Sequence, residues 1–456
     1  MGMKKYNNYK NSGIEWIGEI PEHWNAKRLK NIGNLFSGLS GKSGTDFSPE
    51  ATLTTKPFIN FTNVANNKYI VLDNFGHVNL DENEKQNLVK KGDLLFLMSS
   101  ENQEDVGKSS LLNQDYGELY LNSFCKGLRV LDENINPEFL NYLLNSSILS
   151  KLVSLEGRGF TRINLRMEGV QNLPIIYPNL QEQTTIANYL DHKTNQIDTL
   201  IAKKQQFISL LQEERIAVIN QAVTKGLDPK AKMKDSGIEW LGEIPEHWEV
   251  LSFRFCIDVL TDFTSNGSFA SLAQNVNYLE SGYSRLVRLT DLRIDLKNDG
   301  LYVDENAHNF LKNSELFGGE MLIANVGAYA GLVKIMPHIE GKHTLAPNMF
   351  LLRLNQNSDF FFHQLNAPFC AEQLKMMAIS SAQPKLNKDN MRQLKVVKPS
   401  LEEQVFLVKH IEKESLRIND LQFKVEQEIE LLKEYKTALI SEVVTGKVDV
   451  REVVLN

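Results

Sequence analysis

Signs of a membrane, secreted or metal-binding protein are scarce in this sequence. Its three cysteines, Cys125, Cys256 and Cys370, lie far apart and form no CxxC pair, so neither a disulfide framework nor a zinc site is expected. His338 and His343 have no third ligand nearby, and a tetrahedral site needs more ligands. No apolar run approaches the ~20 residues that span a bilayer, and the start MGMKKYNNYK lacks an apolar signal segment. We therefore expect a cytoplasmic protein with no membrane partner and no bound metal.

Signatures of common catalytic sites are missing as well. Gly41-Lys42-Ser43 and Gly107-Lys108-Ser109 lack the glycine of a phosphate-binding loop five residues earlier, where Phe36 and Asn102 stand. There is no Asn/Asp-Pro-Pro-aromatic motif for methyl transfer to a base, no Pro-Asp pair of the common nuclease pattern, and no G-x-S-x-G. The chain is predicted to be non-catalytic and to bind no cofactor of its own.

Charge does not single out a partner. The chain has 456 residues and a net charge of −7. Residues 181–228 hold six acidic and five basic residues, a net −1, and residues 401–449 hold eleven and seven, a net −4. These two stretches carry −5 of the −7, so the rest is close to neutral. Net charge reports on solubility and steering rather than on each surface, and a DNA-binding face is not excluded.

The chain repeats itself. Lys10–Trp24 (KNSGIEWIGEIPEHW) and Lys234–Trp248 (KDSGIEWLGEIPEHW) are identical at thirteen of fifteen positions; we call these the opening motifs. Further along, PNLQEQ at 178–183 matches PSLEEQ at 399–404, and 223–228 matches 444–449. Two half-proteins in tandem are therefore predicted, and such a pseudo-two-fold reader would suit duplex DNA. For the opening motif itself, a packing anchor is favoured over a ligand contact.

A region unlike its counterpart follows each opening motif, at about 25–156 and 249–379. Both regions contain short apolar runs separated by Asn, Gly and Ser, which predicts strands and turns, and helices are expected at 137–152 and 359–377. The expected strands are 57–61, 69–72, 93–98, 286–289, 321–324 and 349–354. Each variable region is predicted to be a mixed α/β domain.

A long helix is predicted after each variable region. Apolar residues recur every seven positions, with one break at Lys204, and neither stretch contains Pro or Gly before Gly226 or Gly446. The helices can therefore run about 40 residues, roughly 60 Å, and the shared heptad favours their pairing as an antiparallel coiled coil. Packing on unrelated cores is the alternative. The seam residues are Leu190, Ile197, Leu211, Val218, Ile411, Ile418, Val425, Leu432 and Leu439.

Candidate DNA contacts occur at matching positions of the two halves. In the first half, three arginines at positions i, i+4 and i+8 lie near small polar residues just before the helix, and a cationic face of this kind suits phosphates and guanine edges. A solvated surface loop is the alternative. Three further arginines alternate with apolar residues in a strand-like stretch, where an ordinary exposed face is equally compatible. The candidates are Arg158, Thr161, Arg162, Asn164, Arg166, Arg285, Arg288, Arg293, Gln383, Lys385, Asn387 and Lys388.

The combination of tandem W-[IL]-G-E-I-P-x-H-W motifs, P-x-L-x-E-Q exits and paired helices resembles the specificity subunit of type I restriction-modification systems over essentially the whole chain. One departure is that Gly92-Asp93 becomes Gly319-Glu320, and another is that Gly327–Gly331 has no clean match in the first half. The resemblance implies two target-recognition domains that each read half of a split DNA sequence. It also implies helices that set the spacing and dock two methyltransferase subunits, with restriction subunits further out. S-adenosylmethionine, ATP and Mg²⁺ would then be bound by those partners.

The predicted fold is a mixed α/β tandem pseudo-two-fold repeat of two globular domains joined by an antiparallel coiled coil. The expected boundaries are a first recognition domain at 1–156, a loop, helix and linker at 157–233, a second recognition domain at 234–379, and a second loop and helix at 380–456. The predicted function is DNA sequence recognition for a type I complex. A stand-alone nuclease-methylase or a DNA-binding scaffold without sequence preference are the alternatives.

Overall fold

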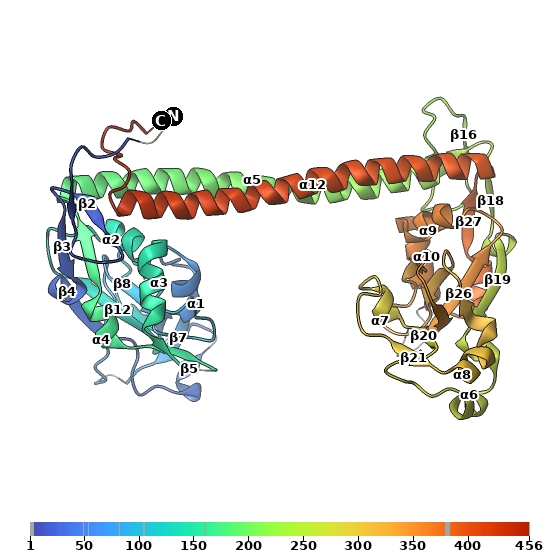
Figure 1. The fold of residues 1–456 in the computed structure, drawn as a ribbon, viewed down its shortest axis with the longest axis horizontal. Helices are drawn as coiled ribbons and strands as arrows, with labels where there is room; N and C mark the ends of the chain where they lie inside the picture. The colour runs from blue at the N-terminus through green and yellow to red at the C-terminus, as the bar shows by residue number, and fades with distance from the viewer. Residues whose placement is uncertain are drawn as a thin grey trace. The chain divides into compact units, whose positions relative to one another are not determined.

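The computed structural model describes residues 4–48, 50–52, 54–81, 83–103, 105–159, 161–378 and 384–455. The chain forms two compact units (Figure 1). Unit 1 contains Met1–Gln205 together with Glu426–Asn456, and unit 2 contains Gln206–Val425. The expected pair of mixed α/β domains is confirmed, but the end of the chain packs with unit 1. Among the described residues, no helix combines the length and the apolar character needed to cross a membrane.

Each unit contains an antiparallel four-stranded sheet with the same strand order. The order is β10-β8-β12-β4 in unit 1 and β24-β23-β26-β19 in unit 2. All residues of β8 and of β23 are buried, which explains why continuous apolar runs marked these strands in the sequence. In unit 1 these strands span Ser109–Leu111, Leu94–Leu97, Cys125–Val130 and Gly33–Ser37, and in unit 2 Val333–Ile335, Met321–Ala324, Met349–Leu354 and Ile257–Asp262.

A second four-stranded sheet in each unit contains one parallel pair, β6 with β11 in unit 1 and β20 with β25 in unit 2. The sheets differ in their fourth strand. In unit 1 it is β5, which pairs with the antiparallel neighbour β7, whereas in unit 2 it is β22, which pairs with β25. The strands are β11 Tyr120–Leu121, β6 Thr55–Ile59, β7 Phe75–Asn79, β5 Phe47–Ser48, β21 Leu301–Val303, β20 Ser284–Val287, β25 Lys342–Leu345 and β22 Glu315–Leu316.

Small sheets connect the remaining segments of each unit. The opening motif forms the pair β1–β2 in unit 1 and β16–β17 in unit 2, and the strand after it pairs with the strand before the long helix. Unit 1 also has a three-stranded sheet, β13-β14-β9. The bounds are β1 Tyr9–Asn11, β2 Glu19–Pro21, β16 Met233–Asp235, β17 Glu243–Pro245, β3 Asn25–Arg28, β15 Pro174–Tyr177, β18 Glu249–Ser252, β27 Lys395–Lys398, β13 Gly157–Arg158, β14 Ile163–Leu165 and β9 Ser99–Ser100.

The two short helices expected in the variable regions are each split in two. The first splits into α2 (Pro137–Leu144) and α3 (Ser147–Leu155), because Ser146 caps the second helix. The second splits into α9 (Ser358–Asn366) and α10 (Pro368–Ala378), since proline starts a helix but cannot continue one. The other short helices are α1 Phe61–Asn66, α4 Met167–Asn172, α6 Phe269–Asn275, α7 Leu289–Leu292, α8 Glu305–Phe310 and α11 Lys388–Gln393, with 3-10 turns at Leu29–Asn31, Gly44–Asp46, Phe253–Phe255, Phe263–Asn266 and Lys312–Ser314.

Two strand predictions were wrong. Residues 69–72 form no strand, and only Tyr69 makes an isolated bridge, to Leu111. Residues 286–289 are a strand only to Val287, because the backbone N–H and the guanidinium of Arg288 both donate to Asp291 in the first turn of helix α7. Near the first site the Asn63 side chain bonds both the N–H and the carbonyl of Val71, so in both cases local side-chain bonds compete with the sheet ladder.

Two long helices, α5 (Leu180–Lys225, 46 residues) and α12 (Leu401–Val444, 44 residues), contribute to both units. Each is followed closely by a glycine in the left-handed region, Gly226 at φ 67° and Gly446 at φ 74°. Such a glycine is a common helix stop because it satisfies the last carbonyl groups without Cβ strain. The uninterrupted helices predicted from the missing Pro and Gly are therefore confirmed.

Within unit 1 the helices pair antiparallel. Lys436 Nζ lies 2.7 Å from Asp198 Oδ2, and Lys204 pairs with Glu428. Residues later in α5 therefore contact residues earlier in α12. Lys204 is the break in the heptad pattern, and its ammonium reaches a carboxylate of the partner helix. A polar residue at such a position fixes the register of a coiled coil.

Within unit 2 the same direction holds, since Arg417 pairs with Glu214 and Gly226 lies beside Glu403. The antiparallel coiled coil is thereby confirmed in each unit. The predicted seam residues are fully or partly buried: Leu190, Ile197, Leu211, Val218, Ile411, Ile418, Val425, Leu432 and Leu439.

The sequence differences between the halves at Asp93/Glu320 and at Gly327–Gly331 correspond to only small differences in the structure. Gly331 does have a counterpart in unit 1, because its N–H and that of Gly107 donate to the last residue of β23 and of β8, and both have positive φ. Asp93 pairs with Arg129 at 2.7 Å, and Glu320 with the corresponding Arg353 at 3.4 Å. The longer acid therefore keeps the same kind of ion pair.

Gly107 offers a test of this packing. Its φ is 86°, and an added Cβ would overlap Cγ1 of Val153, whereas Gly117 has the same φ of 86° with no atom in the way. We expect Gly107→Ala to lower the free energy of unfolding of unit 1 by about 3 kcal/mol through strain and overlap. Gly117→Ala should cost only about 1 kcal/mol from strain alone. Chemical denaturation followed by fluorescence measures both, and equal losses would contradict the overlap.

Candidate nucleic-acid interface

The opening motif of unit 1 is a buried anchor for the start of helix α5. Trp24 is fully buried, and its Nε1–H donates to Glu182 Oε1 at 3.0 Å. His23 Nε2 lies 2.8 Å from Glu182 Oε2, and the Tyr6 hydroxyl donates to Oε1 at 2.8 Å. Burial and this carboxylate raise the pKa of Tyr6, so its hydroxyl stays a donor. Gly446, at the end of α12, packs against Trp24.

Unit 2 repeats this anchor with the other ends of the long helices. Trp248 Nε1–H donates to Glu403 Oε1 at 3.0 Å, and His247 Nε2 lies 2.9 Å from Oε2. Gly226, which follows α5, packs against Trp248. All three repeated motifs therefore meet in each unit, and the packing interpretation of the opening motif is confirmed.

The predicted arginine loop of unit 1 lies on one exposed sheet. Arg158 in β13 stands opposite Asn164 in β14, and Asn164 stands opposite Ser99 in β9. Arg158, Thr161, Arg162, Asn164 and Arg166 are all exposed. The sheet brings most of the predicted residues together, with Arg158 and Asn164 on its paired strands.

One arginine of this loop stacks on an aromatic ring that sequence reasoning missed. The Arg162 guanidinium lies 4.5 Å from the ring centroid of Phe124, and Phe124 packs edge-on against Phe61. Both rings are about 40% exposed. A guanidinium held over an exposed ring can contact phosphate or a base while the ring contact limits its movement.

The matching loop of unit 2 carries lysines. Lys385 is exposed and bridges Val326, at the place where Asn164 meets β9 in unit 1. Lys388 is 3.1 Å from Asp262, so part of its charge is already paired. Asn387 caps helix α11. The fourth candidate, Gln383, lies outside the described residues.

Beside this loop is a hollow of about 720 Å³ between α6 and the ends of β23 and β26. Asn325, Asn348 and Lys385 line it, with the exposed rings of Phe269 and Tyr278. Asn348 has a positive φ of 68°. Sequence reasoning missed the asparagines and rings because single polar and aromatic residues near turns are ordinary.

The three arginines predicted on one strand face are not together. Arg285 lies in β20 and donates to the backbone carbonyl of Leu296 at 3.2 Å, and Arg288 lies 2.7 Å from Asp291 at the start of α7. Arg293 lies beyond α7. The prediction of a single cationic strand face is therefore wrong, because the guanidinium groups of Arg285 and Arg288 bind nearby residues of their own segment.

The described residues contain no group of three or more His, Cys, Asp or Glu side chains placed for a metal ion. All three cysteines are buried, and burial raises the pKa of Cys125 to about 12 and that of Cys256 to about 11. These thiols are therefore protonated and unreactive near neutral pH. Gly107-Lys108-Ser109 leads into strand β10 rather than a helix, unlike a phosphate-binding loop.

Comparisons with known proteins agree with this geometry. The family profile "Type I restriction modification DNA specificity domain" matches residues 21–209 and 289–431. The putative type I restriction enzyme MjaX specificity subunit of Methanocaldococcus jannaschii is 24% identical over 446 residues, 95% of this chain and 96% of that protein. The EcoKI specificity subunit of Escherichia coli (strain K12) is 24% identical over 416 residues, 87% and 82% of the two chains.

Solved structures show the same fold. The HsdS subunit from Thermoanaerobacter tengcongensis aligns with a TM-score of 0.58 and 14% identity over 94% of this chain and 98% of that one. A chain from a study of assembly and conformational transition of the type I R-M system aligns with a TM-score of 0.70 and 14% identity, covering 94% and 99%.

The carboxylates of the two anchors differ in burial, so removing each one should cost a different amount of folding free energy. Glu182, with a side chain 4% exposed, accepts three hydrogen bonds, whereas Glu403, at 25%, accepts two. We expect Glu182→Ala to destabilise unit 1 by about 3 kcal/mol, since buried donors lose their acceptor, and Glu403→Ala to cost unit 2 about 1 kcal/mol. Hydrogen exchange of the two opening motifs measures each loss locally. A larger loss at Glu403 would contradict the comparison.

Proposed function

The chain belongs to the type I restriction-modification DNA specificity domain family, and we propose that each of its units reads one half of a bipartite DNA site. The chain is the DNA sequence-recognition subunit of a type I system. The observation that carries the proposal is that two units share one buried frame, built on Trp24 and Trp248, but present unlike exposed loops. A shared frame with different surfaces suits a reader of two different half-sites.

The exposed loops supply the chemistry for this proposal. Arg158, Arg162 and Arg166 in unit 1, and Lys385 in unit 2, are cations that can contact phosphates. Asn164 lies beside the arginines, and asparagine can pair with the adenine edge in the major groove. Base specificity would then come from each unit separately.

The coiled coil is proposed to set the gap between half-sites and to dock two methyltransferase subunits, with restriction subunits bound through them. Its seam is buried, so docking would use the outward faces of the helices. Exposed apolar side chains lie on these faces in unit 1 (Leu200, Leu431 and Tyr435) and in unit 2 (Phe207, Leu210 and Phe423). The partners would bind S-adenosylmethionine, ATP and Mg²⁺ and carry out the chemistry in the cytoplasm.

The central test maps methylated positions in DNA from cells that make this chain with its methyltransferase subunit. A single bipartite sequence, absent when the chain is omitted, is the expected result. Methylation by the purified chain alone would favour a nuclease-methylase, and binding to random and enriched duplexes with equal affinity would favour a scaffold without sequence preference.

The arginine loop gives a prediction about salt. Replacing Arg158, Arg162 and Arg166 with Ala should weaken DNA binding and lower the slope of log K against log salt by about 3, close to one per lost phosphate contact. The control replaces the same residues with Lys, which keeps the charges and should keep most of the slope. Titrations at several salt concentrations measure both. An unchanged slope with failed assembly would assign these arginines to a protein interface.

The helices give a prediction about spacing. The end of α5 is unsuitable for an insertion because Ala222 and Val223 are fully buried in the core beneath Trp248. Four residues inserted after Gln205 and four after Glu426 would lengthen both helices by about 6 Å. At about 3.4 Å per base pair, the gap should grow by one or two pairs with the recognised bases unchanged.

The control for this experiment inserts two residues at each of the same places. Two residues rotate the rest of each helix by about 200°, which turns its apolar seam away from the partner helix. The helices should then fail to pair, and methylation should be lost instead of moving to a new gap. Methylation mapping reads both variants. If the four-residue variant still methylates the original spacing, the helices do not set the gap.

A further inference from the structure

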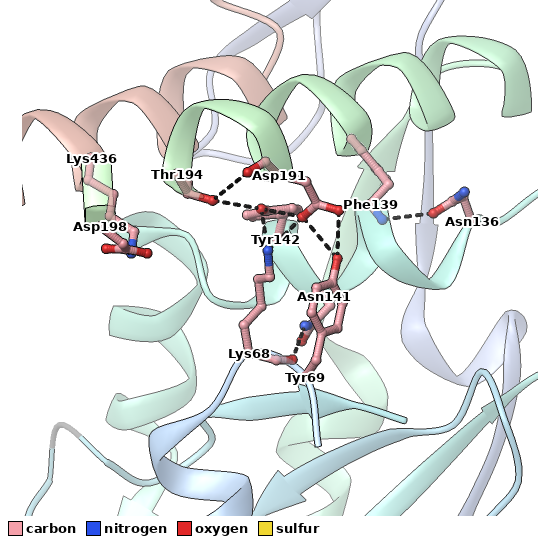
Figure 2. A network of polar contacts seen from close by, with 10 residues as sticks. All are labelled: Lys68, Tyr69, Asn136, Phe139, Asn141, Tyr142, Asp191, Thr194, Asp198 and Lys436. Carbon is pink, nitrogen blue, oxygen red and sulfur yellow. Dashed lines mark hydrogen bonds and ion pairs between the residues drawn. The ribbon is translucent and has the colours of Figure 1, made fainter. Parts of the chain in front are cut away.

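A polar cluster joins the recognition domain of unit 1 to helix α5 (Figure 2). Lys68 Nζ lies 2.6 Å from Asp191 Oδ1, and the Tyr142 hydroxyl donates to the same oxygen at 2.6 Å. The Tyr69 hydroxyl lies 2.9 Å from both oxygens of Asp191. Three side chains of the recognition domain thus converge on one carboxylate of the helix. We call Lys68, Tyr69, Tyr142 and Asp191 the Lys68 clamp.

The clamp is held from both sides. On the domain side, the backbone carbonyl of Lys68 accepts from Asn141 Nδ2 at 2.8 Å, and the Lys68 ammonium lies 4.4 Å and 4.6 Å from the ring centroids of Tyr69 and Tyr142. On the helix side, Thr194 Oγ1 lies 3.2 Å from the Tyr142 hydroxyl. Figure 2 shows these groups on facing elements. The hydrogen bonds and ring contacts therefore fix the orientation of the Lys68 ammonium, in addition to its attraction to the Asp191 carboxylate.

Burial makes the cluster sensitive to the loss of any member. Burial lowers the pKa of Lys68, while Asp191 opposes that shift. The hydroxyls of Tyr69 and Tyr142 have raised pKa values through burial and the same carboxylate, so both remain donors. Removing one partner of a partly buried ion pair leaves an uncompensated charge, which costs more than the pair itself contributes.

Unit 2 has no such clamp among its described residues. The position 221 residues after Asp191 is Glu412, which is exposed and has no described hydrogen bond or ion pair, and the position matching Tyr142 is His363. There the helix that matches α5 is α12, which the domain meets through apolar packing and through Gln404, whose Oε1 accepts from the Asn357 N–H at 3.1 Å and whose Nε2 donates to Gln356 at 2.9 Å. Unit 1 has the matching contact of Gln183 with Asn136, so the Lys68 clamp is what distinguishes the two joints.

We propose that the Lys68 clamp is a positioning device that fixes the angle of the first recognition domain on α5 and thereby restricts the complex to one spacer length. The proposal rests on the proposed function. Apolar packing is non-directional, whereas several hydrogen bonds to one carboxylate restrict rotation. A change of angle at this joint moves every loop of the domain together, so spacing changes while the bases read do not.

A pair of variants separates positioning from stability. Lys68→Met leaves Asp191 without its cation, whereas Lys68→Met with Asp191→Leu also removes the charge, and apolar replacement of a whole pair is often neutral for stability. Lys68→Met keeps the two tyrosine hydrogen bonds to Asp191, and the double variant removes every bond to this carboxylate. The matched control is Glu412→Gln, which changes an exposed carboxylate at the equivalent place in unit 2.

The variants are tested as complexes with the methyltransferase subunit in cells, by mapping methylated sites and by thermal unfolding of the purified complexes. Both clamp variants should methylate sites with a spacer one base pair longer or shorter roughly tenfold more often than the unmodified complex, a factor typical of coupling within one polar network. The bases should stay the same, and Glu412→Gln should change nothing. The double variant leaves no unpaired charge but takes the acceptor from Tyr69 and Tyr142, so it should unfold above Lys68→Met and below the unmodified complex.

Two results would overturn the proposal. One is a single spacer in both clamp variants. The other is a spread of spacers in Lys68→Met alone that disappears in the double variant, because the cluster would then act only through stability. If Lys68→Met does not assemble, the double variant and Asp191→Asn decide between the same outcomes. The absence of any bipartite site for the unmodified complex would instead refute the proposed function.

Discussion

The hydrogen bond between a buried tryptophan and a glutamate in the first turn of a long helix is the constraint on which both units depend. Trp24 meets Glu182 in unit 1 and Trp248 meets Glu403 in unit 2. Each carboxylate lies at the N-terminus of its helix, where a negative charge is favourable. The same tryptophan packs against the glycine that ends the other long helix. One contact therefore fixes the strand that enters a recognition domain, the helix that leaves it and the helix that returns to it.

This arrangement explains why sequence repeats and structural units differ. The opening and exit motifs of one repeat meet in one unit, but the third motif of that repeat, such as 223–228, packs in the other. The sequence order predicted each half as a contiguous stretch, whereas residues 426–456 belong to unit 1. An antiparallel pair makes this exchange unavoidable, since each helix starts in one unit and ends in the other.

The features that the sequence predicted correctly were those marked by heptad periodicity or by continuous apolar runs. The heptad of Ile411 and its successors located the seam, and the buried runs of β23 and β26 located strands. Local side-chain bonds defeated the same reasoning elsewhere. Arg288 looked like a strand residue but donates to Asp291 at the start of α7, and Tyr69 bonds the helix α5 rather than a sheet. The Tyr69 contact, like that of Lys68, depends on Asp191 far along the chain, so no local pattern marks it.

The buried frame and the exposed loops of each unit also differ in how well they tolerate substitution. The frame residues are buried and hydrogen-bonded, so a change there costs folding free energy. The loops at 157–166 and 384–388 are largely exposed, and a change there costs the frame little. The fourth strand of the second sheet even sits on opposite edges in the two units, which shows how much the recognition domains differ on one frame. Recognition can therefore vary in one unit without disturbing the other, provided that the joint between domain and helix stays rigid. In unit 1 the Lys68 clamp supplies directional polar contacts at that joint, because Lys68, Tyr69 and Tyr142 all bond the one carboxylate of Asp191.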